Sequence, residues 1–299
     1  MKLAITGGTG FVGRHLIRLA TEAGHEVRAL ARRGQPDQPG VTWVAGALNR
    51  PDSLAALVAG VEAVIHVAGV INAPDRAGFA AGNIAGTQAM LTATTQAGVS
   101  RFVHVSSLAA REPALSDYGW SKAESEAPVA AASLDWTIVR PPAVYGPGDR
   151  EMLELFRMAK RGVMPLPPGG RLSLIHVEDL ARLLLLLATG DGALRETIEP
   201  DDGVPGGWDH RDLARAIGAA VDRRVLPLPV PAAMLRLVAW GDGLIRRDRA
   251  KLTPDRVRYF CHPDWVAARR PAAGLWRPAV ATADGLRATA AWYRAAGRL

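Results

Sequence analysis

The sequence predicts an α/β fold in which a doubly wound parallel sheet is followed by a smaller, mostly helical lobe. Over the first 140 residues, short apolar runs alternate with helical patterns, which is typical of βαβ units. The runs are mostly apolar throughout, as expected of parallel strands that are buried on both faces. Glycines gather directly after the first run, where such a sheet turns into its first helix.

Each expected strand is a run of five or six residues, and a helical pattern fills most of the intervals. The expected strands are Lys2–Thr6, Glu26–Ala31, Val41–Ala45, Ala63–Val67, Arg101–Ser106 and Trp136–Arg140. The expected helices are Val12–Ala23, Pro51–Val58, Ile84–Ala97 and Tyr118–Ala131. Because crossover connections between parallel strands are right-handed, these units build a doubly wound sheet.

The regular alternation ends after Arg140. Prolines and glycines mark turns near residues 141–148 and 165–170, and Ile175–Ala188 predicts a strand end that runs into a helix. We expect a nucleotide-binding Rossmann domain over residues 1–165, to which residues 173–200 return. Residues 166–299 are expected to form an interleaved substrate-binding lobe, with loops over the carboxyl ends of the strands, where such folds bind ligands.

The composition is that of a globular protein and excludes several classes. Of 299 residues, 48% are apolar and 22% are charged, and the net charge of +7 comes mainly from scattered arginines. Scattered arginines favour a solvated surface over a nucleic-acid site. The lone Cys261 excludes a disulfide framework, and with no leader pattern it predicts a cytoplasmic protein. The Leu183–Leu187 run is too short to span a membrane and predicts a buried helix.

No cluster of His, Cys and Asp has the spacing of a metal site, so no metal is expected. We expect a monomer or homodimer that binds a small-molecule substrate.

Thr6–Gly13 predicts a phosphate-binding loop, because it follows the first strand and opens the first helix. Glycines allow a tight turn and a close approach of the backbone to a pyrophosphate, and the helix start offers free N–H groups. The expected contacts with the cofactor are Gly7, Thr9, Gly10, Phe11 and Val12.

The end of the second strand indicates which dinucleotide binds. NAD is usually held by an acidic residue there, whereas this chain has Arg32 and Arg33. Two guanidinium groups suit a 2′-phosphate, so the sequence predicts NADP over NAD. The alternative is that both arginines are ordinary surface charges.

Tyr118 and Lys122 lie four residues apart in an expected helix, so they share one face. A nearby ammonium group favours the phenolate, and we therefore expect Lys122 to lower the pKa of Tyr118. Such a tyrosine can take or give a proton in alcohol or carbonyl chemistry.

Together these segments resemble the extended branch of the short-chain dehydrogenase/reductase superfamily over essentially the whole chain. The matching segments, in chain order, are Thr6–Gly13 (T-G-x-x-G-x-x-G), His66–Gly69, Asn83 with Gly86 and Thr87 (N-x-x-G-T), Phe102–Ser107, Tyr118 with Lys122 (Y-x-x-x-K), Arg140–Gly148 (R-P-x-x-V-Y-G-P-G), Ile175–Ala181 and Gly285–Tyr293. Each motif alone is weak, whereas their order and spacing together are specific.

The resemblance implies roles for three catalytic residues. Tyr118 would be the acid/base, Ser107 would hydrogen-bond the substrate oxygen, and Lys122 would hold the nicotinamide ribose. Ser107 matches the motif better than Ser106 does. Further cofactor contacts implied by the matching motifs are Ala47, Leu48, Val67, Ala68, Gly69, Pro141, Ala143 and Val144.

Two positions and one loop depart from the branch. Ala47 stands where an Asp usually meets the adenine, so adenine contacts must come from elsewhere. The ten residues between Ser107 and Tyr118 make a shorter loop than in the sugar epimerases. Ala143 replaces an Asn with which epimerases contact the sugar nucleotide, and a methyl group cannot make those contacts.

The sequence therefore favours an NADP-dependent oxidoreductase acting on a carbonyl or hydroxyl group, near the 3β-hydroxysteroid dehydrogenases and dihydroflavonol reductases. Two alternatives stay open: a sugar-nucleotide epimerase/dehydratase, and an NADP-binding structural subunit of the type associated with respiratory complex I. The apolar stretch Ala232–Trp240 is more typical of a core helix than of a pocket wall. Arg246–Arg258 favours a solvated face over a partner or an anionic membrane surface.

Overall fold

The computed structural model describes residues 1–246 and 254–299, which divide into two compact units. Unit 1 consists of Met1–Pro141, Glu178–Pro200 and Arg269–Arg277. Unit 2 consists of Pro142–Val177, Asp201–Ala268 and Pro278–Leu299.

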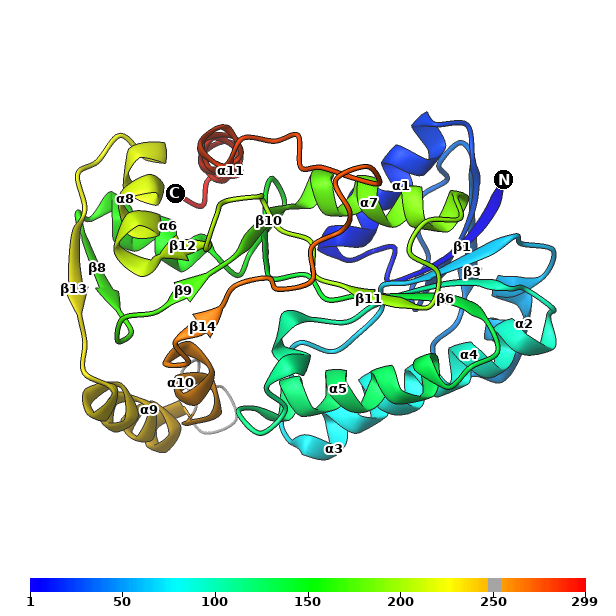
Figure 1. Ribbon diagram of the computed structural model, residues 1–299, viewed down its shortest axis with the longest axis horizontal. Coiled ribbons are helices and arrows are strands. Elements are labelled where there is room, and N and C mark those ends of the chain that lie inside the picture. Colours follow the sequence, from blue (N-terminus) through cyan, green and yellow to red (C-terminus); the bar gives the residue numbers. More distant parts are fainter. Residues whose placement is uncertain (247–253) are drawn as a thin grey trace. The chain divides into compact units, whose positions relative to one another are not determined.

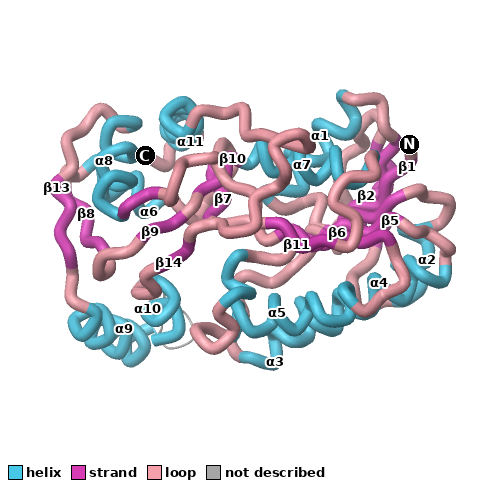
Figure 2. The backbone as a smooth tube through the Cα atoms, in the orientation of Figure 1, coloured by secondary structure: helices cyan, strands magenta, loops and turns pink. Residues whose placement is uncertain are grey.

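Unit 1 contains a seven-stranded sheet in which every pair of neighbours is parallel. Figure 2 shows its strands in magenta. In spatial order its strands are β11 (Glu196–Ile198), β6 (Asp135–Val139), β5 (Arg101–Val105), β4 (Ala63–His66), β1 (Lys2–Thr6), β2 (Glu26–Ala31) and β3 (Val41–Ala45). The strand order reverses between β1 and β4, which is where a doubly wound sheet opens a crevice at its carboxyl edge. The predicted fold class is confirmed.

Helices cover both faces of this sheet (Figure 1). α1 (Phe11–Glu22) and α7 (Val177–Thr189) lie on one face, and α2 (Pro51–Val58), α4 (Gly86–Gln96) and α5 (Asp117–Ala130) lie on the other. Shorter elements are α3 (Arg76–Phe79), the π-helix η1 (Ala80–Ala85) and the 3₁₀-helix η2 (Leu108–Arg111). Leu54, Met90 and Val129 of the second face pack into one core with Phe102 and Ile138 of the strands.

The first three strands and α2 have the bounds that the sequence predicts, and the other predicted strands are shifted by one residue at most at each end. β11 is absent from the prediction, because three residues carry too little pattern to mark a strand. The Leu183–Leu187 run lies in α7, with three of its leucines fully buried. In the described parts of the chain, no helix is long and apolar enough to cross a membrane.

Unit 2 consists of short strands and helices. They are β7 (Ala143–Tyr145), α6 (Leu153–Lys160), β8 (Val163–Leu166), β9 (Arg171–Leu172), β10 (Leu174–His176), β12 (Trp208–Asp209), α8 (His210–Ala220), β13 (Leu226–Pro229), α9 (Ala232–Arg246), α10 (Pro254–Phe260), β14 (Asp264–Trp265) and α11 (Thr282–Ala295). Their core centres on the buried rings of Tyr145, Phe156 and Tyr293. The Tyr293 hydroxyl donates to Asp149 Oδ2 over 3.1 Å.

The prediction that Ala232–Trp240 forms a core helix is wrong for most of its side chains. The stretch is helical in α9, but Met234, Leu237, Val238 and Trp240 are each more than half exposed. Hydrophobic periodicity detects an amphipathic helix without showing which of its faces is covered.

Candidate active site

The Gly-rich segment forms a tight turn between β1 and α1. Gly7 has a φ of +73°, and a Cβ there would lie 2.7 Å from the backbone nitrogen of Ala68. A Cβ at Gly13 would overlap the carbonyl oxygen of Gly7. α1 begins at Phe11 with Gly10 as N-cap, so no side chain satisfies its first N–H groups. Free donors and the positive end of the helix dipole therefore lie at the carboxyl edge of the sheet, which fits a dinucleotide pyrophosphate.

The next predicted contacts lie around this turn. Thr9 and Gly10 are exposed, and Phe11 and Val12 are half-buried in the first turn of α1. No side chain caps this helix start, so its first N–H groups are left for a ligand.

Arg32 and Arg33 follow directly on β2, and both are exposed. Among the described residues, neither guanidinium group has a hydrogen-bond or ion-pair partner. Two unpaired cations side by side at a strand end fit a phosphate monoester.

The loop after β3 adjoins the end of β2, because the Gly46 N–H donates to the carbonyl oxygen of Ala31 over 3.0 Å. Ala47 exchanges backbone hydrogen bonds with the Ser53 hydroxyl, at 3.3 and 3.2 Å. Leu48 packs against Gly86 at the start of α4, where a Cβ would lie 2.7 Å from Leu48 Cδ1. Ala47 and Leu48 thus offer backbone and apolar surface where other members of the branch have a carboxylate.

The residues after β4 approach the predicted catalytic lysine. The Ala68 N–H donates to Thr6 Oγ1 over 3.1 Å, and Val67 is half-buried beside it. A Cβ at Gly69 would lie 3.1 Å from Asn83 Oδ1 and 3.7 Å from Lys122 Nζ. The end of β4, the π-helix η1 and α5 therefore meet at one point.

Asn83 joins these elements, although the sequence marked it only as part of a motif. It is buried, it accepts from the Val70 N–H at 2.6 Å, and it donates to the Val70 carbonyl at 3.0 Å. Its amide also donates to Ser121 Oγ over 2.8 Å. A π-helical turn is common at functional sites, and here it carries a residue that holds α5 beside the loop after β4.

Ser107 and Tyr118 are brought together by the packing of α5 against η2. α5 begins at Asp117, and its N-cap Ser116 accepts from the Gly119 N–H over 3.0 Å. A Cβ at Gly119 would lie 2.8 Å from the Ala109 carbonyl oxygen, so glycine permits the close approach. The side chains of Ser107 and Tyr118 are hydrogen-bonded to each other.

The electrostatics of Tyr118 differ from the prediction. Burial raises the pKa of Tyr118 above its ordinary value of 10.0, and the hydrogen bond with Ser107 opposes this rise only in part. The expectation that Lys122 lowers this pKa is therefore wrong for the ligand-free chain. The Lys122 ammonium group instead donates to the carbonyl oxygen of Val105, at 2.8 Å.

Lys122 itself is buried, with 4% of its surface exposed. Burial lowers the pKa of Lys122 from 10.5 to about 8, and the Glu126 carboxylate one turn later opposes the shift. At neutral pH the side chain is charged and lies next to the exposed backbone of Gly69.

A buried ionic network supports Lys122, and the sequence did not predict it. Arg140 donates through two nitrogens to the two carboxylate oxygens of Glu126, at 2.9 and 2.6 Å. The third guanidinium nitrogen of Arg140, Nη1, lies 3.6 Å from Oε1 of the buried Glu199. Ser106 donates to Glu126 over 2.5 Å. Ser106 is thus engaged in the network, whereas Ser107 bonds the tyrosine, which agrees with the preference for Ser107.

The last three predicted contacts lie on either side of the boundary between the units. Pro141 is buried in unit 1, and its carbonyl oxygen accepts from the Leu108 N–H over 2.9 Å, directly after Ser107. Ala143 and Val144 belong to β7 in unit 2, where Ala143 is exposed.

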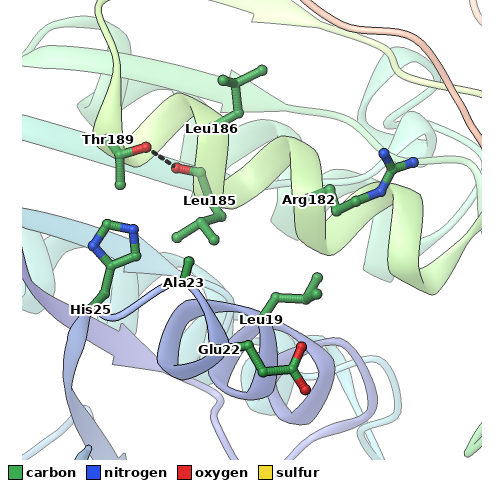
Figure 3. A pocket seen from close by; sticks show the side chains of 8 residues that line it. All are labelled: Leu19, Glu22, Ala23, His25, Arg182, Leu185, Leu186 and Thr189. Atoms are coloured by element: carbon green, nitrogen blue, oxygen red, sulfur yellow. Dashed lines mark hydrogen bonds between the residues drawn. The ribbon is translucent and has the colours of Figure 1, made fainter.

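A surface pocket of about 480 Å³ lies in unit 1 between the C-terminal half of α1 and α7 (Figure 3). Leu19, Ala23 and Leu185 line it together with polar side chains such as Glu22 and Arg182. The glycine loop lies at the opposite end of α1, about 18 Å away for a helix of this length. Within residues 1–246 and 254–299, no group of three His, Cys, Asp or Glu side chains could hold a metal ion.

Comparisons with known proteins agree with this arrangement. The chain is 39% identical to ceramide reductase of Caulobacter vibrioides, over 99% of this chain and 96% of that protein. It is 29% identical to 2-alkyl-3-oxoalkanoate reductase of Stenotrophomonas maltophilia, over 96% and 98% of the two chains. Both names describe reductases, as the predicted oxidoreductase requires.

Two solved structures have the same fold. The human epimerase family protein SDR39U1 with NADPH has a TM-score of 0.76 at 21% identity, over 97% of this chain and 99% of that one. MoeE5 with UDP-glucose and NAD has a TM-score of 0.72 at 22% identity, over 99% of each chain. The model of the NAD dependent epimerase/dehydratase family matches residues 3–197. The chain therefore belongs to the NAD dependent epimerase/dehydratase family, in the extended branch of the short-chain dehydrogenases/reductases, and is an NAD(P)-dependent oxidoreductase.

Proposed function

We propose that the protein is an NADP-dependent ketoreductase in which Tyr118 protonates the carbonyl oxygen of the substrate as it is reduced. The hydrogen-bonded pair of Ser107 and Tyr118, with charged Lys122 on the same helix face, carries the proposal. Bound NADPH would supply the hydride. Ser107 would donate a hydrogen bond to the oxygen on which negative charge develops, and Lys122 would bind the cofactor beside Gly69.

The pKa of Tyr118 favours the reductive direction. Because burial raises this pKa, the phenol stays protonated at neutral pH and is ready to donate. A carbonyl oxygen becomes strongly basic as it is reduced, so a neutral phenol within hydrogen-bond reach is a suitable acid. Oxidation of an alcohol would need the phenolate, which burial disfavours.

The preference for NADP rests on Arg32 and Arg33. Their guanidinium groups are exposed and unpaired among the described residues at the end of β2, where the ribose of a bound dinucleotide is expected. No acidic residue stands there to accept the ribose hydroxyls of NAD.

For the substrate, we propose a ketone that carries long alkyl or acyl chains, of the ceramide type. One relative is named for a ceramide and another for an alkyl-substituted oxoalkanoate, and both cover nearly the whole chain. Both names describe aliphatic substrates, and one of them names the 3-oxo group. Reduction of the oxo group of a 3-oxo-ceramide would give the secondary hydroxyl of a ceramide.

The test is an NADPH-oxidation assay with a 3-oxo-ceramide in mixed micelles, with the product identified by mass spectrometry. Tyr118→Phe is expected to lower kcat by a hundredfold to ten-thousandfold, roughly the contribution of one general acid, without changing the Kd for NADPH. Tyr259→Phe, on α10, serves as the matched control and should keep full activity. Full turnover by Tyr118→Phe would refute the mechanism. Stabilisation by UDP-sugars with no ketone reduction would instead favour the epimerase.

We also propose that the protein is cytoplasmic, as its single cysteine predicts, and that it is a monomer or a homodimer. Cell fractionation and sedimentation equilibrium test the two statements separately.

A further inference from the structure

The helix α9 presents an apolar face to solvent, which is unusual for a globular protein. Met234 is 56% exposed, Leu237 66%, Val238 54% and Trp240 64%. With the exposed Ala233, these residues recur at intervals of three and four and so form one continuous stripe along the helix. We call these five residues the α9 face.

The opposite side of α9 is covered within unit 2. Ala239 is 1% exposed and Leu235 is half-buried, and α9 packs along α10 (Figure 1). The helix therefore packs against the rest of unit 2 through its less apolar side. The α9 face is left over after folding, so its apolar side chains are available for something outside this unit.

Arginines lie on α9 and on the neighbouring α10. Arg236 is exposed at one edge of the α9 face, and Arg258 is exposed on α10, where its guanidinium group also pairs with Asp255 at 2.5 Å. Phe260 on α10 is 47% exposed. From Arg236 to Arg258 the sequence has seven basic residues against three acidic ones. Part of the Arg246–Arg258 segment, residues 247–253, lies outside the described residues.

An apolar helical stripe that contains an exposed Trp and is bordered by arginines has the composition of a helix that lies in a membrane interface. Such helices bury the apolar side chains at the boundary between headgroups and acyl chains, while Arg and Lys bind anionic headgroups. Trp is favoured at this depth because its ring is apolar and its N–H is polar.

We propose that the α9 face binds the surface of an anionic phospholipid bilayer, with α9 parallel to the membrane plane. No described helix can span a bilayer, so this contact would be peripheral and reversible. Its purpose, direct access to a membrane-dissolved ketone, rests on the proposed function. The binding itself does not, and it can be measured without any substrate.

The test uses the full-length protein and sedimentation with vesicles. One set of vesicles is phosphatidylcholine with about 30% phosphatidylglycerol, and the other is phosphatidylcholine alone. The variant Leu237→Gln/Trp240→Gln removes the two most exposed apolar side chains of the α9 face. Leu186→Gln replaces a 39% exposed leucine on α7 and is the matched control.

The wild type is expected to bind the anionic vesicles and to bind more weakly as NaCl rises from about 0.1 to about 0.5 M, because salt screens the arginines. The double variant should bind about 100-fold more weakly, since each lost side chain contributes about tenfold. Leu186→Gln should bind like the wild type. Unchanged melting temperatures and NADPH affinity would show that the variants are folded.

Three results would overturn the proposal. The first is that the wild type does not sediment with anionic vesicles. The second is that the double variant binds within about threefold of the wild type. The third is that the wild type forms a dimer in solution and that Leu237→Gln/Trp240→Gln dissociates it. The last would identify a second copy of the chain as the occupant. Vesicle binding without ketone reduction would refute the proposed function, whereas the proposal that the α9 face binds membranes would stand.

Discussion

Replacing Lys122 by Met is expected to stabilise the ligand-free protein while it abolishes turnover. Lys122 is almost fully buried, and its ammonium group has one hydrogen bond, to the Val105 carbonyl oxygen at 2.8 Å. Met has a similar unbranched shape and no charge to desolvate, so it fits the same space. The protein keeps a buried charge here because the proposed chemistry requires it, at a cost in stability.

The magnitude follows from the pKa of Lys122, which burial lowers from 10.5 to about 8. A shift of this size corresponds to about 3 kcal/mol, at about 1.36 kcal/mol per pKa unit. Loss of the hydrogen bond to Val105 costs about 1 kcal/mol. The net gain in the free energy of unfolding at pH 7 is therefore about 2 kcal/mol, or a few degrees in Tm.

The stability that Lys122→Met gains over the wild type should decrease as the pH rises. Between pH 8 and 10.5 the unfolded wild type still holds the Lys122 proton, whereas the folded wild type has released it. The free energy of unfolding of the wild type therefore rises with pH across this window. Lys122→Met cannot show this rise, so its advantage should be full below pH 8 and should shrink toward pH 10.

Urea unfolding followed by circular dichroism, at several values between pH 6.5 and 10 and without cofactor, measures these differences. Lys160→Met is the control, because Lys160 is exposed on α6 and should show no pH-dependent difference from the wild type. A variant at Lys122 that is less stable than the wild type at pH 7, or whose advantage does not change with pH, would refute the reasoning.

Two further predictions concern the cofactor. Replacing Arg32 and Arg33 together by Ala should weaken NADPH binding by about 100- to 10,000-fold, at about 1.5–3 kcal/mol for each of two charge-assisted bonds, and leave NADH affinity unchanged. Calorimetry with both nucleotides measures this, and tighter binding of NADH by the wild type would contradict the assignment. Gly13→Ala should abolish NADPH binding and lower Tm, because its Cβ would overlap the Gly7 carbonyl oxygen. Gly169→Ala, where a Cβ meets no neighbour, should change neither property.

The parallel sheet was predictable because buried strands leave a local pattern. Lys2–Thr6 and Val41–Ala45 are short apolar runs between turn residues, and their bounds follow from that pattern alone. β11 was not predictable, because its three residues pair with β6 through contacts 59 positions apart in the chain, from Thr137 to Glu196. The pattern of residues within a short segment does not show which distant strand that segment pairs with.

Likewise, the candidate site could be predicted in its residues but not in its electrostatics. The interval of four residues between Tyr118 and Lys122 predicts that they lie on one face of a helix, and both residues lie in α5. Burial is a property of the whole fold, and it decides both pKa values. It raises the pKa of Tyr118 and lowers that of Lys122, so it favours the uncharged form of each group.

What keeps Lys122 charged at neutral pH is a chain of residues that no motif connects. The Glu126 carboxylate opposes the effect of burial on Lys122, and Arg140 neutralises Glu126 through two hydrogen bonds. Glu199, which is 1% exposed, lies 3.6 Å from Arg140 and follows β11 directly. Because an unpaired buried charge is costly, each member depends on the next. The strand that sequence patterns miss therefore positions Glu199, a carboxylate of the network of charges that includes the predicted active-site lysine.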